Sequence, residues 1–309
     1  MALLSRVADR IYWAARYMER AEDTSRVVSA FGDVFVEMPT IDSGEQSLWA
    51  PLATLVGGAT IDPSLDEAAV VRALVVDHNQ PCSVAASVGH ARSNLRTTRE
   101  VLPREAWQAV NDLWMFVERD VDRAVDRRFR RRILNKVIDD SRRLEGILMS
   151  TMTRDAAYDM WRLGRLMERA DMTTRVVGVR AAALMTSDDH TQDEVHWMGV
   201  LRSLSALQMY QRAVRGPVEG RDVVRFLLFH DRFPRSVAFT LGEMTVSLGR
   251  LSRSDDVGAA VTEAERVLRS TPAVVDDGRF LDQAMEEVQV ALQAVSAAIE
   301  QRYLRVGDT

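Results

Sequence analysis

Apolar residues recur at intervals of three and four along most of the chain, which is the spacing of one face of an α-helix. The first series predicts a long helix that runs to about residue 36. Its apolar positions are Leu4, Val7, Ile11, Ala15 and Met18. Helix-breaking residues follow this stretch, beginning with Met38-Pro39, so the helix should end there.

The same periodicity continues to the end of the chain. Ser64-Leu65-Asp66-Glu67 has the form of a capping box that opens a helix, and Pro103 suits the first turn of another. No alternating β-branched pattern competes with these series. We therefore predict an all-α helical bundle, with further helices over about 49–56, 65–76, 83–102, 133–152, 156–185, 192–214, 221–229, 235–252, 257–270 and 277–304.

Two segments of the chain resemble two later ones. Segments 16–28 and 165–177 are identical at nine of 13 positions, and segments 70–85 and 223–238 at eight of 16. Chance would give roughly one identity in each window. Trp49 and Trp197 also correspond. Because the matches keep one order and nearly one offset, we predict two tandem copies of a helical unit of about 150 residues, spanning 1–152 and 153–309.

The first repeated segment carries a charged stripe. Arg16, Glu19, Asp23 and Arg26 follow helical spacing, and Glu22 precedes Arg26 by four residues, the favourable orientation for an ion pair. Asp171 and Arg175 repeat that pair in the second copy. Solvated pairs of this kind contribute only about 0.2–0.5 kcal/mol each, a weak reason to keep them in both copies. We favour a buried or cleft-facing network over two solvated faces.

Such a network could join the two halves or hold an anionic ligand between arginines, and the spacing does not separate these roles. In the second repeated segment Ser83 and Ser236 are predicted N-caps, and Arg235 beside a helix N-terminus could instead help to bind an anion. Cys82 lies at such a terminus, which could lower its thiol pKa. The candidate ligand- or partner-binding residues are Arg16, Glu19, Arg20, Arg26, Arg165, Glu168, Arg169, Arg175, Arg235 and Ser236.

Composition excludes several classes of protein. The formal net charge of −5 argues against a dedicated nucleic-acid binder. Lys136 is the only lysine among 40 basic residues. Arginine suits bidentate pairing with carboxylate or phosphate, but an arginine-favouring genome is the explanation that we prefer. A single cysteine, no signal-peptide core and no long apolar run predict a cytoplasmic protein without a membrane span.

Common catalytic and cofactor signatures are missing from the sequence. There is no P-loop, no dinucleotide-binding fingerprint, no zinc-protease motif and no di-iron Glu-x-x-His pattern, so we expect no cofactor and no metal. One metal-like grouping, Asp189 with Asp193 and His196, is better explained as a helix end. The run Arg127–Arg132 is expected to form a solvated helix face or junction.

Several strings of the sequence resemble the bacterial Alpha-E family, whose name refers to its helical content and a Glu-Arg motif. The resemblance covers essentially the whole chain. It lies chiefly in Leu4–Trp13 with Arg16–Glu22, in Ala91–Asn94 with Arg99-Glu100, in Trp197–Tyr210 and in Phe226–Val237. Two departures, His230-Asp231 where the family tends to have Asp-Pro and Gln80 between Asn79 and Pro81, put the geometry of those loops in question.

The resemblance implies a partnership more than a reaction. Members of the family typically accompany a circularly permuted ATP-grasp ligase, often with a transglutaminase-like protein, which implies amide-bond formation on a peptide or small amino compound. We therefore expect an accessory or substrate-presenting partner of such a ligase. Two alternatives stay open: an enzyme using Glu19 or Glu168 as acid/base in a helical cleft, and a purely structural interaction module.

Overall fold

A computed structural model of the chain describes residues 3–37, 49, 52, 55–56, 65–185, 193–271 and 281–305. Helices and the turns between them account for all of these residues, and no strand occurs among them. The predicted all-α class is therefore confirmed. No helix within the described ranges is long and apolar enough to cross a membrane.

The predicted helices are present with some shifted ends, except for the short helix expected over about 49–56, most of which lies outside the described residues, as do Met38-Pro39. The first part of the chain forms α1 (Ser5–Glu37), α3 (Glu67–Val71), a π-helical turn (Arg72–Val76), α4 (Val84–Arg96), a 3-10 turn (Arg99–Val101), α5 (Arg104–Asp120), a second 3-10 turn (Val121–Val125) and α6 (Arg127–Thr151). The rest forms α7 (Ala156–Met185), α8 (Asp193–Ser203), α9 (Leu207–Ala213), α10 (Gly220–Phe229), α11 (Val237–Leu248), α12 (Asp255–Ser270), α14 (Leu281–Ile299) and a π-helical turn (Glu300–Leu304).

Three details differ from the sequence expectation. The N-cap of α3 is Asp66, whose carboxylate accepts from the backbone N–H of Ala69, whereas Ser64 lies outside the described residues. The helix expected over 192–214 breaks after Ser203, where Ser205 adopts a positive φ of 51°. Helix α6 begins at Arg127, capped by Asp126, so the arginine run forms its first turns.

The arginine run is only partly solvated. Arg130 is buried, where its guanidinium donates to the carbonyl oxygens of Ala124 and Val125 and to the carboxylate of Glu67. The run was expected to form a solvated helix face or a junction, and Arg130 lies at a junction, because it contacts the preceding 3-10 turn and the start of α3. Arg128 is exposed and pairs with Asp126.

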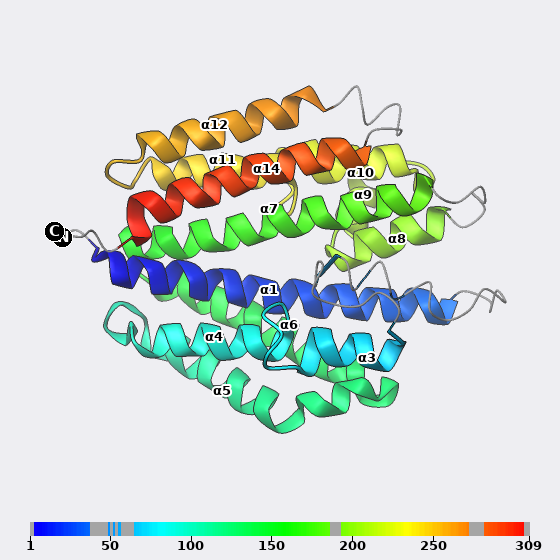
Figure 1. The fold of residues 1–309 in the computed structure, drawn as a ribbon, viewed down its shortest axis with the longest axis horizontal. Coiled ribbons are helices and arrows are strands. Elements are labelled where there is room, and N and C mark those ends of the chain that lie inside the picture. Colours follow the sequence, from blue (N-terminus) through cyan, green and yellow to red (C-terminus); the bar gives the residue numbers. More distant parts are fainter. Residues whose placement is uncertain are drawn as a thin grey trace.

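Helices α1 and α7 run side by side through the centre of the molecule and in the same direction (Figure 1). Their backbones are close where Gly164 of α7 meets α1: a Cβ added at Gly164 would lie 2.3 Å from the carbonyl oxygen of Tyr12 and 3.0 Å from the Cβ of Ala15. Glycine permits this crossing because it has no side chain. The helix contact brings the two repeated charged segments together.

Each half places three further helices around its central helix. In the first half α4 and α6 pack on α1 while α5 packs on both α4 and α6. In the second half α11 and α14 pack on α7 while α12 packs on both α11 and α14. Figure 1 shows these two groups on opposite sides of the α1–α7 pair. Buried apolar residues from both groups form one continuous core around that pair.

Candidate functional site

The charged stripes of α1 and α7 meet each other across the helix contact. Glu168 of α7 accepts from Arg16 Nε at 2.8 Å and from Arg20 Nε at 2.5 Å. Its carboxylate is buried, with 3 % of the side chain exposed. Together with Asp171 and Arg175, which form an ion pair at 3.1 Å, these residues make up the Glu168 cluster.

A second cluster repeats this arrangement with the helices exchanged. Glu19 of α1 accepts from Arg165 Nε and from Arg169 Nε, each at 2.8 Å, and its side chain is completely buried. Each glutamate is thus held by arginines three residues before and one residue after the equivalent glutamate on the other helix. The polar network that we favoured from the sequence exists, and it joins the two halves of the molecule.

The Glu19 cluster is larger because an additional arginine reaches it. Arg235, in the turn before α11, donates to Asp23 at 2.6 Å and to Glu19 at 3.0 Å. Its side chain is 8 % exposed. Arg26 pairs with Glu22, as its spacing predicts, and lies 3.1 Å from Asp23. The Glu19 cluster therefore consists of Glu19, Glu22, Asp23, Arg26, Arg165, Arg169 and Arg235.

Arg235 is placed by the helix cap that follows it. The hydroxyl of Ser236 accepts from the N–H of Phe239 and donates to the carbonyl of His230. In the first half Ser83 makes the same two contacts, with Ala86 and Asp77. Both predicted serine caps are confirmed. The two loops have matching hydrogen bonds despite their different sequences. The anion next to Arg235 is supplied by the protein itself, as Asp23 and Glu19.

Burial and neighbouring charges set the protonation of the clusters. Burial raises the pKa of Glu19, but the charges of Arg165, Arg169 and Arg235 outweigh it and hold the pKa well below its ordinary value. Burial likewise raises the pKa of Glu168, but the charges of Arg20 and Arg16 outweigh burial and lower this pKa to about 2. A general acid or base needs a pKa near the working pH. Both glutamates are therefore poorly suited to the acid/base role that was one alternative.

The Glu168 cluster lacks the groups that close the Glu19 cluster. By sequence equivalence Met172 replaces Asp23, and Cys82 replaces Arg235. A hollow of about 230 Å³ lies at this position, which we call the Cys82 hollow. Its lining comprises Arg20, Val56, Pro81, Cys82, Glu168, Asp171, Met172 and Arg175. Burial raises the pKa of the Cys82 thiol, opposite to the lowering that its place before a helix suggested.

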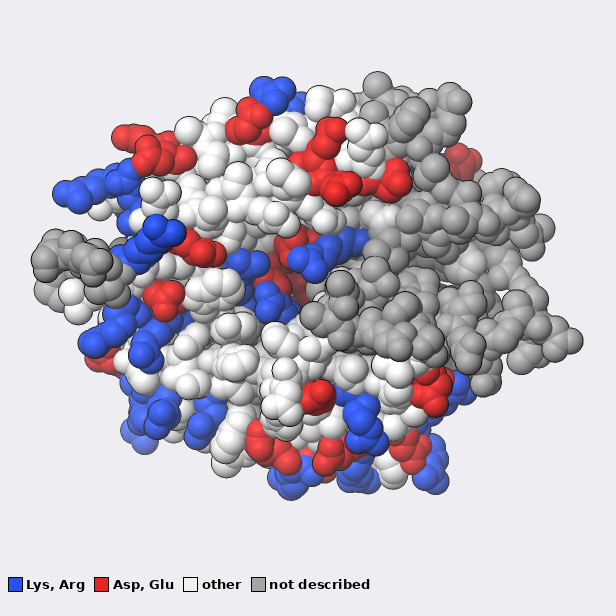
Figure 2. Space-filling view, viewed as in Figure 1, with Lys and Arg blue, Asp and Glu red and all other residues white. Residues whose placement is uncertain are grey.

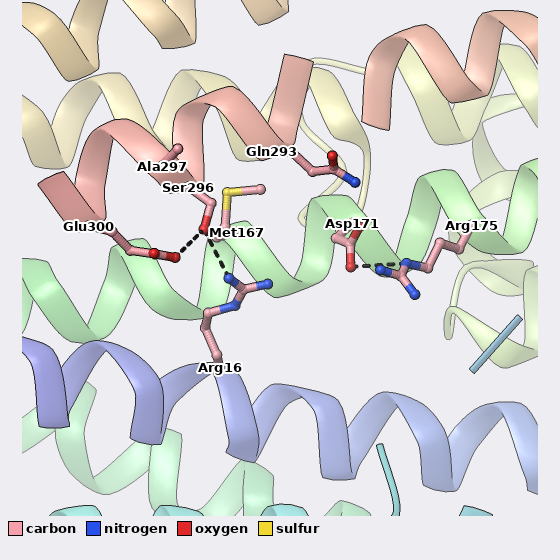
Figure 3. A pocket seen from close by; sticks show the side chains of 8 residues that line it. All are labelled: Arg16, Met167, Asp171, Arg175, Gln293, Ser296, Ala297 and Glu300. Atoms are coloured by element: carbon pink, nitrogen blue, oxygen red, sulfur yellow. Dashed lines mark hydrogen bonds and ion pairs between the residues drawn. The ribbon is translucent and has the colours of Figure 1, made fainter. Parts of the chain in front are cut away.

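A neighbouring hollow of about 260 Å³, the α14 hollow, lies on the other side of Asp171 and Arg175. It is lined by Arg16, Met167, Asp171, Arg175, Gln293, Ser296, Ala297 and Glu300 (Figure 3). Ser296 accepts from Arg16 at 3.1 Å and its hydroxyl lies 3.2 Å from Glu300 Oε1. Figure 2 shows basic and acidic side chains gathered in a recess at the middle of this face.

The predicted candidates fall into two groups. Of the ten residues predicted from the sequence, five belong to the Glu19 cluster: Glu19, Arg26, Arg165, Arg169 and Arg235. A sixth, Ser236, positions Arg235 there. Arg16, Arg20, Glu168 and Arg175 join the Glu168 cluster beside the hollows. Sequence reasoning missed Gln293, Ser296 and Glu300, since no repeat marks them and only packing of α14 on α7 brings them here.

Metal binding has no support in the described residues, which contain no group of three or more His, Cys, Asp or Glu side chains placed to hold an ion. Of the grouping of Asp189, Asp193 and His196, Asp189 and the side chain of Asp193 lie outside the described residues.

Comparison with known proteins places the whole chain in one family. The Alpha-E family, described as a predicted alpha-helical domain with a conserved ER motif, matches residues 3–304. An uncharacterized protein of Mycobacterium bovis and one of Mycobacterium tuberculosis are each 24 % identical over 272 residues, covering 81 % of this chain. The chain spans only 30 % of the length of these relatives. No solved structure matches.

The Glu-Arg dipeptides at the centre of the two clusters fit the description of that family. Glu19-Arg20 and Glu168-Arg169 lie at equivalent points of α1 and α7, and each dipeptide supplies the glutamate of one cluster and an arginine of the other. The match over residues 3–304 and the all-helical architecture agree with the resemblance seen in the sequence. The chain belongs to the Alpha-E family of helical domains.

Proposed function

We propose that this chain is a non-catalytic accessory module of an ATP-grasp amide ligase, and that it presents the ligase's substrate at the Glu168 cluster. The observation that carries the proposal is the inequality of the two clusters. Arg235 fills the Glu19 cluster, while the equivalent place beside Glu168 is a hollow next to Cys82. The Glu19 cluster then has a structural role, and the Glu168 cluster retains arginines that border a space open to solvent.

The electrostatics favour binding over catalysis. Arg175 is 39 % exposed, and Arg20 is 20 % exposed, so both guanidinium groups can meet a ligand from solvent. Arginine forms bidentate pairs with carboxylate groups, which a substrate for amide formation carries. Neither Glu19 nor Glu168 has a pKa that suits proton transfer near neutrality.

The size of the relatives supports a domain that works with another one. The matching region accounts for 30 % of the M. bovis and M. tuberculosis proteins, so this domain occurs within longer chains. The identity of the partner, an ATP-grasp ligase with an associated transglutaminase-like protein, comes from the family resemblance. Cytoplasmic location and independence of nucleic acid and membrane belong to the same proposal.

We also infer that the two halves, 1–152 and 153–309, arose as tandem copies. The repeated segments, the same packing order of helices around α1 and α7, and the exchanged ion pairs all support this inference. Under this view only the Glu168 cluster retains an open polar site, since Cys82 stands there in place of Arg235.

Affinity purification of the tagged protein from its native cell, at low salt and with ATP, tests the proposal. We expect an ATP-grasp ligase to co-purify in stoichiometric amount. Arg175→Gln should keep that association but reduce ligation in the reconstituted complex, whereas Glu286→Gln, at an exposed position of α14, should affect neither. Recovery of the protein alone, or turnover of a peptide by the protein without ligase, would show the proposal to be wrong.

A further inference from the structure

The α14 hollow has a lining of balanced charge. Arg16 and Arg175 supply two positive charges, and Asp171 and Glu300 supply two negative ones. In Figure 3 these side chains come from three helices and border one space, with Gln293 and Ser296 between them. A phosphate would meet two carboxylates as well as the arginines, and a simple cation would meet two guanidinium groups. A ligand that carries both charges is the better complement.

The acids and bases around this hollow are incompletely paired with each other. In the described part of the chain the Glu300 carboxylate forms no ion pair, and its one hydrogen-bond partner is the hydroxyl of Ser296 at 3.2 Å. Arg175 Nε lies 3.1 Å from Asp171, but its N–H makes no aligned hydrogen bond within the described residues. The hollow thus offers the Glu300 carboxylate as an acceptor for an ammonium group, and the terminal N–H groups of Arg175, whose side chain is 39 % exposed, as donors for a carboxylate.

The size and polarity of the α14 hollow restrict the class of ligand further. The hollow of about 260 Å³ is smaller than the roughly 300–1,000 Å³ of pockets that hold drug-sized molecules. Only Met167 and Ala297 add apolar lining, so a large apolar ligand would bury little surface. These dimensions suit a small metabolite better than a nucleotide.

We propose that the α14 hollow binds a free α-amino acid. Its carboxylate is held by Arg175 and Arg16, and its ammonium group by Glu300 and Asp171. Gln293 and Ser296 are neutral polar neighbours of the bound molecule. This inference rests on the proposed function, since it names the class of amino compound that the accessory module presents. It also assigns a role to α14, which contributes none of the residues predicted from the sequence.

Direct binding to the full-length protein tests this assignment. Each standard L-amino acid is titrated calorimetrically, and the tightest is compared with its N-acetyl derivative, its carboxamide and inorganic phosphate. Losing one charged hydrogen-bonding group should weaken binding about tenfold or more. Glu300→Gln and Arg175→Gln should each weaken binding of the free amino acid to a similar extent, while Glu286→Gln, at an exposed position, should keep the original affinity.

Several results would overturn the assignment. These are equal binding of the amino acid and its N-acetyl derivative, preference for phosphate, or no binding of any amino acid to the free protein or its complex. Protection of Cys82 from a thiol reagent, with no effect of Glu300→Gln, would move the ligand to the Cys82 hollow and also refute it. If the ligase still co-purifies in these cases, the proposed function survives and only the ligand is wrong.

Discussion

At the residue scale, the central contacts are the arginines that each long helix extends to the glutamate of the other. Buried ion pairs carry a large desolvation penalty, so their presence alone does not measure stability. Removing one partner is costly, because the remaining charge stays buried without compensation. Glu19 illustrates the extreme case, since three arginines converge on one fully buried carboxylate.

Glu19→Gln should lower the free energy of unfolding by about 3–5 kcal/mol, as expected when a buried ion pair loses one charge. Glu168→Gln should cost less, about 1–3 kcal/mol, because Arg16 and Arg20 border the hollows and can gain water. Urea unfolding at neutral pH measures both. Glu286→Gln, an exposed control, should change stability by less than about 0.5 kcal/mol. Equal losses at Glu19 and Glu168 would contradict the structural difference between the clusters.

Asp23 should make stability depend on pH in the opposite sense to Glu168. Burial raises the pKa of Asp23 to about 6 despite the charge of Arg235, and nearby Glu19 adds to the rise while Arg26 opposes it. A raised folded-state pKa means that the folded protein binds the proton more tightly. The resulting stability is complete below the unfolded value of 3.8 and is lost as pH rises through about 6. Glu168 loses its contribution only as pH falls from 4.5 towards 2.

The wild-type protein should therefore gain about 1 kcal/mol from Asp23 between pH 7 and pH 5. Asp23→Asn removes the titrating group and should remove this gain. Urea midpoints at the two pH values, measured for both proteins, give the difference directly. Parallel pH profiles for the two proteins would mean that Asp23 is ionised throughout this range.

At the scale of elements, the α1–α7 contact depends on the close approach at Gly164. The atoms nearest to a Cβ at this position include the backbone carbonyl of Tyr12, which cannot rotate away as a flexible side chain could. The contact is what allows arginines on one helix to reach the glutamate on the other. Cap residues and apolar periodicity define each helix, but this close approach sets their separation.

Gly164→Ala should destabilise the protein by about 1–3 kcal/mol, because the added methyl group overpacks the helix contact. Gly146→Ala is the matched control, since Gly146 lies in α6 with open space around its Cα. That change should instead stabilise by up to about 1 kcal/mol through helix propensity. Thermal unfolding of the two variants checks the opposite signs. Stabilisation by both would show that α1 and α7 can separate at little cost.

At the scale of the whole molecule, the two halves share one core. Helix α1 packs on α4 and α6 of its own half and also on α7 and α8 of the other. Ion pairs within each cluster also join the two halves. Duplication of a unit therefore need not give two independent folding domains, since α1 and α7 bury much of each other's surface.

Fragments 1–152 and 153–309 should fail to unfold cooperatively when produced separately, because each exposes the buried face of its central helix. When mixed, they should associate and recover a cooperative transition. Circular dichroism during heating and size-exclusion chromatography measure these outcomes, with the intact chain as reference. Cooperative unfolding of either isolated fragment would show that its half has a sufficient core of its own.

The sequence alone determined the features that depend on local spacing. Helical periodicity predicted α1 and α7 closely, the Ser83 and Ser236 caps were identified from their place before a helix, and the Glu22–Arg26 ion pair followed from its four-residue separation. Each of these involves residues within about two turns of one another. The family resemblance rested on the same kind of signal, short strings of residues in a fixed order.

Only the tertiary structure decided what each charged residue contacts. Arg235 meets Glu19 and Asp23 across more than 200 positions of sequence, and Glu300 comes near Arg16 through the packing of α14 on α7. No periodicity encodes such distances, because they arise from how whole helices pack against one another. The repeated motif predicted a paired Glu-Arg polar site and left open whether both copies keep a role. In the structure Arg235 completes the Glu19 cluster, whereas the Glu168 cluster lies beside two hollows.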